Sequence, residues 1–517
     1  MNRDWSDPVL SRADARALEE RLLAGDEALE WEAMTRVGAA IARAVLEDLR
    51  EIGGFSPSGR ILVLPGKGHN GGDALLAAAA ILARSPGAGA DVIFAGGARA
   101  LRPLAARAWR DLEQGAPGRV AERSLRDGCP RACDRYELCL DGIFGFQFRP
   151  PVDAGVAALL DRVNAHAGIR LRAAVDLPSG VCEEPAAKVF RADFTYATGS
   201  VKAPVLEERN RAAVGRLRYL DLGFFAESGA SRAAGRVLKP AVLAPLAALR
   251  DPQSDKRSFG HVVIVGGSRR YPGAVLMCVR AALRSGAGLV TAAVPESLVA
   301  AHSACAPEAI WIGLPETPDG GLALDGLGLL RERMEKATAV VIGPGLGAEP
   351  ETLALAAELA GLGGAPLAID ADALRPEVLA AARGRPLICL PHAGEFRRIA
   401  GDAEGDSDTL QSFARENRAV VVLKGPVTRI SDGRCVYHSL AGGPVLARGG
   451  SGDLLAGLVG GLLAQAPADA LLAACRGVSW HGLAADLLAR ERGQVAVQVT
   501  QLLDHLPAAL RAACDAG

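Results

Sequence analysis

Hydrophobic residues along the first half of the chain form short continuous runs, separated by longer stretches with helical spacing. The runs at 61–64, 91–95, 136–140 and 171–175 are short and dominated by apolar residues, which predicts buried strands. Stretches rich in alanine and leucine lie between them. Alternation of strand and helix predicts a parallel sheet covered by helices on both faces.

Residues 10–49, which precede these strands, predict two helices. Leu18 and Leu22 recur at helical spacing, as do Val37 and Ile41, and charged residues fill the other positions. The pattern indicates a docking or dimer-forming element and assigns no chemistry to it.

The second half repeats the alternation with a second set of apolar runs, which lie at 262–265, 290–294, 339–342, 366–369, 387–390 and 420–423. Between the two halves, residues 225–239 are rich in Ala, Ser and Gly and lack a periodic apolar pattern, which predicts a linker. We therefore expect two α/β domains, 1–234 and 235–517, each built on a doubly wound sheet.

Composition agrees with this interpretation and excludes some classes of function. The chain has 517 residues, half of them hydrophobic and few aromatic, which suits parallel sheets built from Ala, Val and Leu. Its net charge of −1 gives no electrostatic argument for nucleic acid or an anionic membrane. No apolar run is long enough to span a bilayer, and the charged first twenty residues do not resemble a signal peptide.

The ten cysteines are scattered along the chain. Cys129, Cys133 and Cys139 are the closest set, but their spacing and the absence of a histidine partner do not make a zinc pattern. A reduced, cytoplasmic protein is the expectation.

Polar residues follow several strands of the first half. The Gly-rich loop 65–73 carries Lys67, His69, Asn70 and Asp73 ahead of a helix, a geometry that suits phosphate binding at a helix N-terminus. It is neither a Walker loop nor a dinucleotide fingerprint.

Asp141, Asp176 and Ser179 follow later strands of the same half, and a weaker run at 192–197 leads to Lys202. The carboxyl ends of parallel strands share one edge of a sheet, so we expect one shared site there. The alternative is that each aspartate caps a helix or a turn.

The second half contains Gly449-Gly450-Ser451-Gly452-Asp453 at the start of a helical stretch. Glycines let backbone N–H groups converge on an anion at a helix start. A carboxylate such as Asp453 is unexpected there, because it would repel the anion. Its presence is explained if Asp453 accepts the proton of an attacking hydroxyl, which predicts a catalytic base. The alternative is a Gly-rich turn with an aspartate at the helix terminus.

Other strand ends in this half carry polar residues with two interpretations each. Lys424 with Thr428 suits nucleotide phosphates or ribose, although Lys424 could also be a surface residue. His392 could contact a substrate or be structural, and Asp370 and Asp372 could lie near a metal or cap helices.

The sequences at 66–73, 141–145 and 175–180 resemble those of the N-terminal domain of the bifunctional NAD(P)H-hydrate repair enzymes. The resemblance implies a Rossmann-like three-layer sandwich that epimerises the R and S forms of hydrated NADH and NADPH, with Asp176 catalytic. It implies potassium binding by Asn70, Asp141 and Ser179, which supply hard oxygen ligands. The implied substrate-binding residues are His69, Asn70, Gly71, Gly72, Asp73, Gly145, Phe146, Gln147, Phe148, Arg149, Pro150, Pro151 and Asp176.

The second half resembles the ribokinase-like superfamily, in particular its ADP-dependent NAD(P)H-hydrate dehydratase branch, at 343–347, 369–374, 391–396, 423–425 and 449–457. The resemblance implies Asp453 as catalytic base, an anion hole of Gly449, Gly450, Ser451 and Gly452, and Mg²⁺ bridging the phosphates of ADP. The implied hydrate-binding residues are Ala274, Gly345, Gly347, His392 and Asp453, and the implied nucleotide-binding residues are Lys424, Gly425, Pro426, Val427, Thr428 and Gly452.

Together the resemblances predict a repair enzyme whose substrates are the hydrates NADHX and NADPHX, with ADP as co-substrate. We also expect the chain to form a homo-oligomer. The first domain epimerises the hydrate, and the second dehydrates the S form while ADP becomes AMP and phosphate. One alternative is a ribokinase-like small-molecule kinase of the hydroxymethylpyrimidine type. Another is that the first domain is a non-catalytic binding module.

Overall fold

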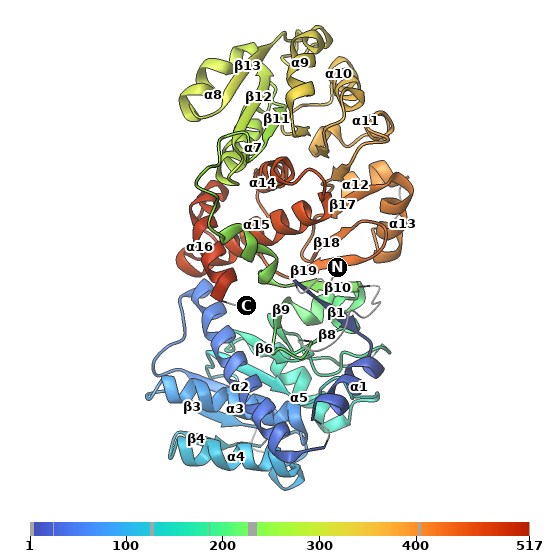
Figure 1. The fold of residues 1–517 in the computed structure, drawn as a ribbon. Helices are drawn as coiled ribbons and strands as arrows, with labels where there is room; N and C mark the ends of the chain where they lie inside the picture. Colours follow the sequence, from blue (N-terminus) through green and yellow to red (C-terminus); the bar gives the residue numbers. More distant parts are fainter. Residues whose placement is uncertain are drawn as a thin grey trace. The chain divides into compact units, whose positions relative to one another are not determined.

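The structure, a computed structural model, describes residues 5–23, 25–124, 129–185, 187–225, 235–401 and 405–515. The chain divides into two compact units. The first unit comprises residues 1–2, 7–233 and 490–493, and the second comprises 3–6, 234–489 and 494–517. Both units are α/β and built on largely parallel sheets, as the sequence predicts (Figure 1).

The first unit contains a parallel sheet with strand order β4-β3-β2-β5-β6-β7-β9. Its strands, in that order, are Val120–Glu122, Gly89–Val92, Arg60–Pro65, Leu138–Gly142, Arg172–Val175, Phe194–Thr198 and Arg216–Leu220. Strand β1 (Ser6–Leu10) pairs in parallel with β8 (Val201–Lys202).

Helices cover both faces of this sheet. Along β2, Ile61 and Val63 pack with α2 (Glu27–Leu49), α3 (His69–Arg84) and α4 (Pro103–Gly115). Leu62 and Leu64 point to the opposite face, where α5 (Ala154–Ala165) packs. The period-two alternation of a strand thus produces the predicted three layers. The remaining helices of the unit are α1 (Arg12–Leu23) and α6 (Arg211–Val214).

Most predicted elements of the first unit are confirmed, with shifted limits. Two helices occupy 10–49, although Leu10 belongs to β1. The strand expected at 136–140 runs to Gly142, so Asp141 lies at the end of β5 rather than in a loop. The sequence analysis missed β9, because its arginines alternate with apolar residues.

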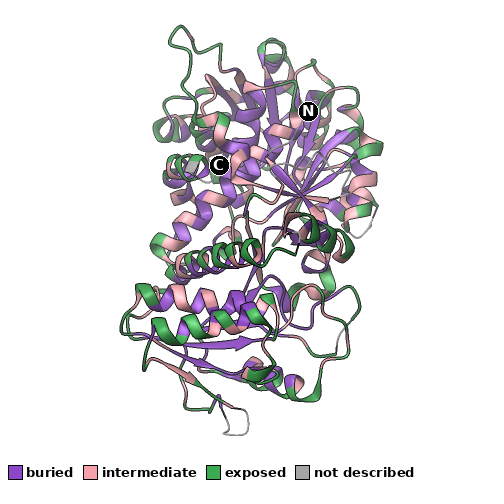
Figure 2. Cartoon of the chain, turned by 60° about the horizontal axis from the view of Figure 1, so that its bottom comes forward, coloured by how far each residue is buried: buried purple, intermediate pink, exposed green. Residues whose placement is uncertain are grey.

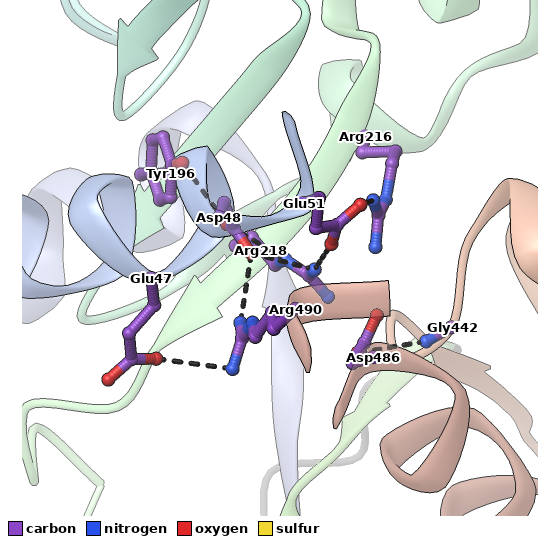
Figure 3. A network of polar contacts seen from close by, with 9 residues as sticks. All are labelled: Glu47, Asp48, Glu51, Tyr196, Arg216, Arg218, Gly442, Asp486 and Arg490. Atoms are coloured by element: carbon purple, nitrogen blue, oxygen red, sulfur yellow. Dashed lines mark hydrogen bonds and ion pairs between the residues drawn. The ribbon is translucent and has the colours of Figure 1, made fainter. Parts of the chain in front are cut away.

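Those arginines form a buried charge network with α2 (Figure 3). Asp48 accepts hydrogen bonds from Arg218 at 2.9 Å, Arg490 at 2.9 Å and Tyr196 at 3.1 Å. Glu51 pairs with Arg216 at 2.6 Å. Acidic residues near a helix C-terminus oppose the helix dipole, so these basic partners stabilise the end of α2.

The second unit contains a sheet with strand order β13-β12-β11-β14-β15-β16-β17-β18-β19-β10. These strands are Ile310–Leu314, Leu289–Pro295, His261–Val265, Ala339–Ile342, Leu367–Ile369, Leu387–Cys389, Ala419–Leu423, Thr428–Ser431, Val436–Ser439 and Gly235–Leu238. All neighbours from β13 to β17 are parallel, whereas β18 is antiparallel to β17 and β19.

One face of this sheet is covered by α7 (Pro272–Arg284), α14 (Ser451–Gln465), α15 (Ala470–Arg492) and α16 (Leu502–Asp515). The other is covered by α9 (Leu327–Lys336), α10 (Pro350–Gly361), α11 (Pro376–Ala381), α12 (Ala393–Ala400) and α13 (Ser407–Asn417). Helix α8 spans Val299–Cys305. Figure 2 shows the strands of both units buried and the outer faces of many helices exposed.

The linker predicted at 225–239 is wrong at its C-terminal end. Gly235–Leu238 forms β10, which pairs in parallel with β19. Residues 226–234 lie outside the described residues. The strand was missed because its four residues, which include Gly235 and Arg236, do not form an apolar run.

Two further observations bear on the class of protein. All ten cysteines are free thiols. Within the described ranges, no helix has both the length and the apolar character that crossing a bilayer requires.

Candidate functional site

The first unit places a buried ion pair at the end of its sheet. Asp176 follows β6, and its Oδ1 lies 2.5 Å from Nζ of Lys202 on β8, with both side chains less than a tenth exposed. Asp176 has a φ of 66°, a left-handed conformation that non-glycine residues rarely adopt. Such strain is often found at functional sites, where the surrounding structure holds it in place.

Asn70, Asp141 and Ser179, which the sequence analysis expected at one sheet edge, are linked to one another through hydrogen bonds. Asp141 accepts hydrogen bonds from Ser179 Oγ at 2.6 Å and Ser179 N at 2.7 Å. Ser179 Oγ accepts from Phe144 N at 2.9 Å, and Asn70 Nδ2 donates to Phe144 O at 2.9 Å. Three strand ends are thereby joined through one loop.

Asp141 is an uncompensated buried acid. Burial raises its pKa to about 6, and its hydrogen bonds from Ser179 and Ile143 oppose that rise. Within the part of the chain that the structure describes, no basic side chain pairs with it. The site therefore has oxygen ligands and an unbalanced negative charge, which suit a hard cation.

Residues 69–73 form the first turn of α3, rather than a loop ahead of it. His69 Nε2 lies 3.3 Å from Glu30 Oε2. A side chain at Gly71 would collide with Gly66 O, so this glycine is required by packing. The amides of this first turn point out of the helix, which keeps an anion site possible there.

Asp73 is buried, and its Oδ1 receives no hydrogen bond from any residue that the structure describes. Burial and the nearby charges of Asp176 and Glu19 raise its pKa well above the usual range. A carboxyl group in this position retains its proton unless a ligand reaches it.

The predicted substrate loop 145–151 is only partly assembled into a pocket. Phe146 lines a small pocket with Lys202, whose Nζ lies 5.5 Å from the centre of the Phe146 ring. Phe148 stacks on Phe144 instead, with ring centres 4.4 Å apart. The other members of the loop do not line this pocket, and Gln147, Arg149 and Pro151 are exposed.

The second unit places its predicted anion hole at the start of α14. The helix begins at Ser451, and Gly450 has a φ of 92°, so a glycine is favoured there. A Cβ at Gly452 would lie 3.4 Å from Lys424 Nζ and 3.8 Å from Asp370 Oδ2. The helix N-terminus thus directly adjoins the charges at the strand ends.

The side chain of Lys424 is largely buried in an ion-pair cluster rather than free on the surface. Its Nζ lies 2.7 Å from Asp370 Oδ1 and 3.7 Å from Glu395 Oε2. Burial lowers the pKa of Lys424, but the carboxylates of Asp370 and Glu395 outweigh it and raise the pKa. Asp370 makes no side-chain cap to the short helix that follows it, so the capping interpretation fails for this residue.

Asp453, in the first turn of α14, is electrostatically coupled to this ion pair. Burial is the main cause that raises its pKa to about 6, followed by repulsion from Asp370, while Lys424 opposes the rise. A carboxyl group with this pKa is ionised at neutral pH and still basic enough to accept a proton. The geometry supports the catalytic interpretation of Asp453.

His392 has a structural role that the sequence did not resolve. Its Nδ1 caps α12 by accepting from Gly394 N at 3.0 Å and Glu395 N at 3.2 Å. Glu395 Oε2 in turn accepts a hydrogen bond from His392 N at 2.8 Å. This capping box fixes Glu395 beside Lys424 and leaves the imidazole exposed for a ligand.

Ala274 and Gly345 lie against each other, since a Cβ at Gly345 would be 2.9 Å from that of Ala274. Ser268, which the sequence analysis did not single out, donates to Gly345 O at 2.8 Å, and its Oγ would lie 3.8 Å from a Cβ at Gly347. Thr428 Oγ1 donates to Gly425 O at 3.4 Å within the turn after Lys424. A separate pocket lined by Arg284, Trp480 and their neighbours contains none of the predicted site residues.

Two residues of the first unit's site were missed or underweighted. Lys202 was noted only as the end of a weak run, because the sequence gives no sign of its partner. Glu19 was given no role, although its burial raises its pKa to about 7. The available signal was a glutamate next to the apolar positions Leu18 and Leu22 of a helix.

Comparison with known families finds a match over each half of the chain. Residues 31–203 match the family described as YjeF-related protein N-terminus, and residues 262–508 match the NAD(P)H-hydrate dehydratase family.

Individual relatives extend these matches. The chain is 36% identical over 473 residues to the bifunctional NAD(P)H-hydrate repair enzyme of Moorella thermoacetica, covering 87% of each chain. Its second half is 38% identical to the ADP-dependent (S)-NAD(P)H-hydrate dehydratase of Xanthomonas campestris, covering 50% of this chain and 92% of that protein. A Bacillus subtilis ADP/ATP-dependent NAD(P)H-hydrate dehydratase structure, co-crystallised with ATP and Mg²⁺, aligns with a TM-score of 0.44 and 28% identity, covering 52% of this chain and 96% of that one.

The Lys202–Asp176 pair yields a stability prediction. Lys202→Met leaves a buried carboxylate without its counter-charge, which should lower the free energy of unfolding of the first unit by about 3–5 kcal/mol. Lys188→Met is the matched control, because Lys188 pairs with Asp161 at 2.7 Å with both side chains about half exposed. It should cost less than about 1 kcal/mol in urea denaturation. Equal losses in the two variants would contradict the role given to burial.

Proposed function

We infer that this chain repairs hydrated NADH and NADPH, because it belongs to the family of the bifunctional NAD(P)H-hydrate repair enzymes. It epimerises the R and S hydrates and dehydrates the S form at the expense of ADP. The small-molecule kinase is not favoured, since relatives that match most of the chain carry the repair name. We assign epimerisation to the first unit and dehydration to the second.

The observation that carries the second assignment is Asp453 at the start of α14, beside the Lys424–Asp370 pair. Hydroxide is a poor leaving group from the hydrated ring. Asp453 takes the proton of that hydroxyl, and the oxygen then attacks the terminal phosphorus of ADP, which breaks its bond to the bridging oxygen and releases AMP. The amides of Gly449 to Gly452 hold the charge that develops on the phosphate.

The phosphorylated oxygen then leaves as phosphate, while the lone pair of the ring nitrogen forms a carbon–nitrogen double bond. Loss of a proton from the adjacent ring carbon returns that electron pair to nitrogen and re-forms the carbon–carbon double bond of the reduced cofactor. Lys424 lies where it can hold a phosphate oxygen, and Asp370 with Glu395 fixes its ammonium group. The loop 425–428 would contact the rest of the nucleotide, and the exposed His392 with Ala274, Gly345 and Gly347 would contact the hydrate. Positioning and charge stabilisation therefore account for the dehydration.

The residues fit a magnesium ion bound chiefly through the nucleotide. Across the described residues, no group of three metal-binding side chains gathers, and Mg²⁺ on a nucleotide needs only one or two carboxylates besides phosphate oxygens. The candidate ligands are Asp370 and Glu395. With Asp453 they make three carboxyl groups around the one ammonium group of Lys424, so a cation would improve the charge balance. The ion would neutralise phosphate charge.

In the first unit, Asp176 is the proposed catalytic residue for epimerisation. Inversion at a carbon that carries a hydroxyl next to a ring nitrogen needs groups that donate and accept protons. Lys202, which lines a pocket together with Phe146, holds the carboxylate of Asp176 in place through its ion pair. The first turn of α3 would hold the phosphates of the hydrate.

We also propose that potassium binds at Asn70, Asp141 and Ser179. The buried, unpaired Asp141 supplies the observation, because a monovalent cation would balance its charge. The homo-oligomer and the cytoplasmic location stay predictions.

A mixed pool of R and S NADPH-hydrate tests the assignment of both activities. With ADP, Mg²⁺ and K⁺, reduced-nicotinamide absorbance should recover fully. Asp453→Asn should slow recovery by about 10²–10⁴-fold, since a positioned base contributes about that much. Asp176→Asn should stop recovery once the S form is consumed, apart from spontaneous epimerisation. Asp408→Asn, at an exposed helix position, is the control. A phosphorylated product that accumulates without cofactor recovery would favour the kinase.

The pH dependence of dehydration follows from Asp453. Because a base acts only when ionised and the pKa of Asp453 is raised to about 6, the rate should fall as the pH drops through that value. The profile is obtained by measuring the dehydration rate at saturating S-hydrate and ADP between pH 5 and pH 8. Circular dichroism at each pH checks that the chain remains folded. A rate that stays constant down to pH 5 would contradict the assignment.

Potassium binding predicts a specific stabilisation. KCl should raise the melting temperature of the first unit more than equal LiCl, because the bound ion compensates Asp141 only when folded. Asp141→Asn and Ser179→Ala should both abolish the difference, whereas the exposed Asp111→Asn should preserve it. A K⁺ effect that persists in both site variants would place the ion elsewhere.

A further inference from the structure

Helix α1 lies beside the first unit's site, although its sequence indicated only a docking element. Strand β1 pairs with β8 so that Leu10 is opposite Lys202, and α1 begins at Arg12. The register therefore sets the start of the helix next to the lysine that holds Asp176.

The same helix packs on the substrate loop. Arg12 Nη1 donates to Phe148 O at 3.4 Å, and Arg12 N donates to Glu183 Oε1 at 3.0 Å. Leu18 lies in a hydrophobic cluster against which Leu22 and Phe146 pack. Arg12, Phe146, Glu183 and Lys202 all line one pocket, so α1 forms part of its wall.

Glu19 follows Leu18 on this helix and is half-buried. The charged groups that act on it come from three other elements: Lys202 on β8, Asp176 after β6, and Glu30 on α2, which itself pairs with His69. Glu19 also acts on Asp73 of α3. Its neighbour Glu20 is instead exposed and pairs with Arg16 at 2.7 Å.

The carboxyl groups around Lys202 outnumber its single positive charge. Glu19, Asp73 and Asp176 are three carboxyl groups that share the ammonium of Lys202. Repulsion among buried like charges keeps protons on part of such a set. Asp176 has the lysine at hydrogen-bond distance, whereas Asp73 is deeply buried and no described residue gives its Oδ1 a hydrogen bond. Glu19 is then the carboxyl that can exchange a proton.

We propose that Glu19 is an acid–base residue of the first unit, which gives a proton to the hydrate and takes it back during epimerisation. This rests on the proposed epimerase function. The Glu19 carboxyl protonates the hydroxyl, the carbon–oxygen bond breaks, and the nitrogen lone pair forms a carbon–nitrogen double bond as water leaves. Water adds to the opposite face, the electron pair returns to nitrogen, and the added water returns one proton to Glu19.

The test compares Glu19→Gln with Glu20→Gln in the full-length chain. R-hydrate conversion is measured by coupling it to the chain's own dehydration step, and the rate with pure S-hydrate reports whether the second unit is intact. Glu19→Gln should slow R-hydrate conversion by about 10²-fold or more, and should remove the loss of rate that the wild type shows as the pH rises through about 7. Glu20→Gln should keep both the rate and the pH profile.

Thermal unfolding gives a readout that does not depend on activity. The pKa of Glu19 is raised above its unfolded value, so ionisation disfavours the folded state as the pH rises from about 4.5 to about 7. Glu19→Gln removes that loss, and its melting temperature relative to wild type should therefore increase across this window, whereas that of Glu20→Gln should not.

The outcomes separate the two levels of the proposal. Wild-type chain that dehydrates S-hydrate but leaves R-hydrate unchanged would overturn the epimerase function itself. Wild-type epimerisation that Glu19→Gln leaves unchanged in rate and pH profile would overturn the role of Glu19 alone, as would parallel melting curves for the two variants.

Discussion

A buried lysine–aspartate pair at the ends of parallel strands is the interaction on which both candidate sites depend. Lys202 holds Asp176 in the first unit, and Lys424 holds Asp370 in the second. Burying either charge alone would be costly, and each pair offsets this through contacts of 2.5 Å and 2.7 Å. In both units the backbone is left-handed at or just after the aspartate, at Asp176 and at Ala371. The sheet therefore holds a charged pair in a fixed orientation at its functional edge.

Beside each lysine–aspartate pair lies at least one further carboxyl group that is not ion-paired with that lysine. The paired and the additional carboxyl groups have different roles in the chemistry of each site. Asp453 next to Lys424 has a pKa of about 6, and Glu19 near Lys202 has a pKa of about 7, chiefly because of burial. A fixed ion pair supplies position and charge, while a carboxyl that titrates near neutrality supplies proton transfer. The two units thus use one electrostatic arrangement for different reactions.

Local patterns predicted most of the parallel strands and the residues at their ends. Asp141 and Ser179 are 38 positions apart, yet they meet because consecutive parallel strands deliver their ends to one edge. The same reasoning missed the antiparallel strands β18 and β19 and the strand β10, because four-residue strands with polar or charged side chains form no continuous apolar run. It also left His392 open between ligand and cap, since both uses require the same residue beside Gly394 and Glu395.

The sequence by itself determined the α/β class, the strand-end motifs and, through resemblance, the repair family, because these depend on local periodicity and on motifs of a few residues. Only the tertiary structure decided which charges meet. Lys202 meets Asp176, Asp73 becomes buried, and Glu19 comes near both charges only because segments far apart in the chain pack together. Burial and electrostatic coupling arise only when the sheet and its helices have assembled, so no local pattern encodes them.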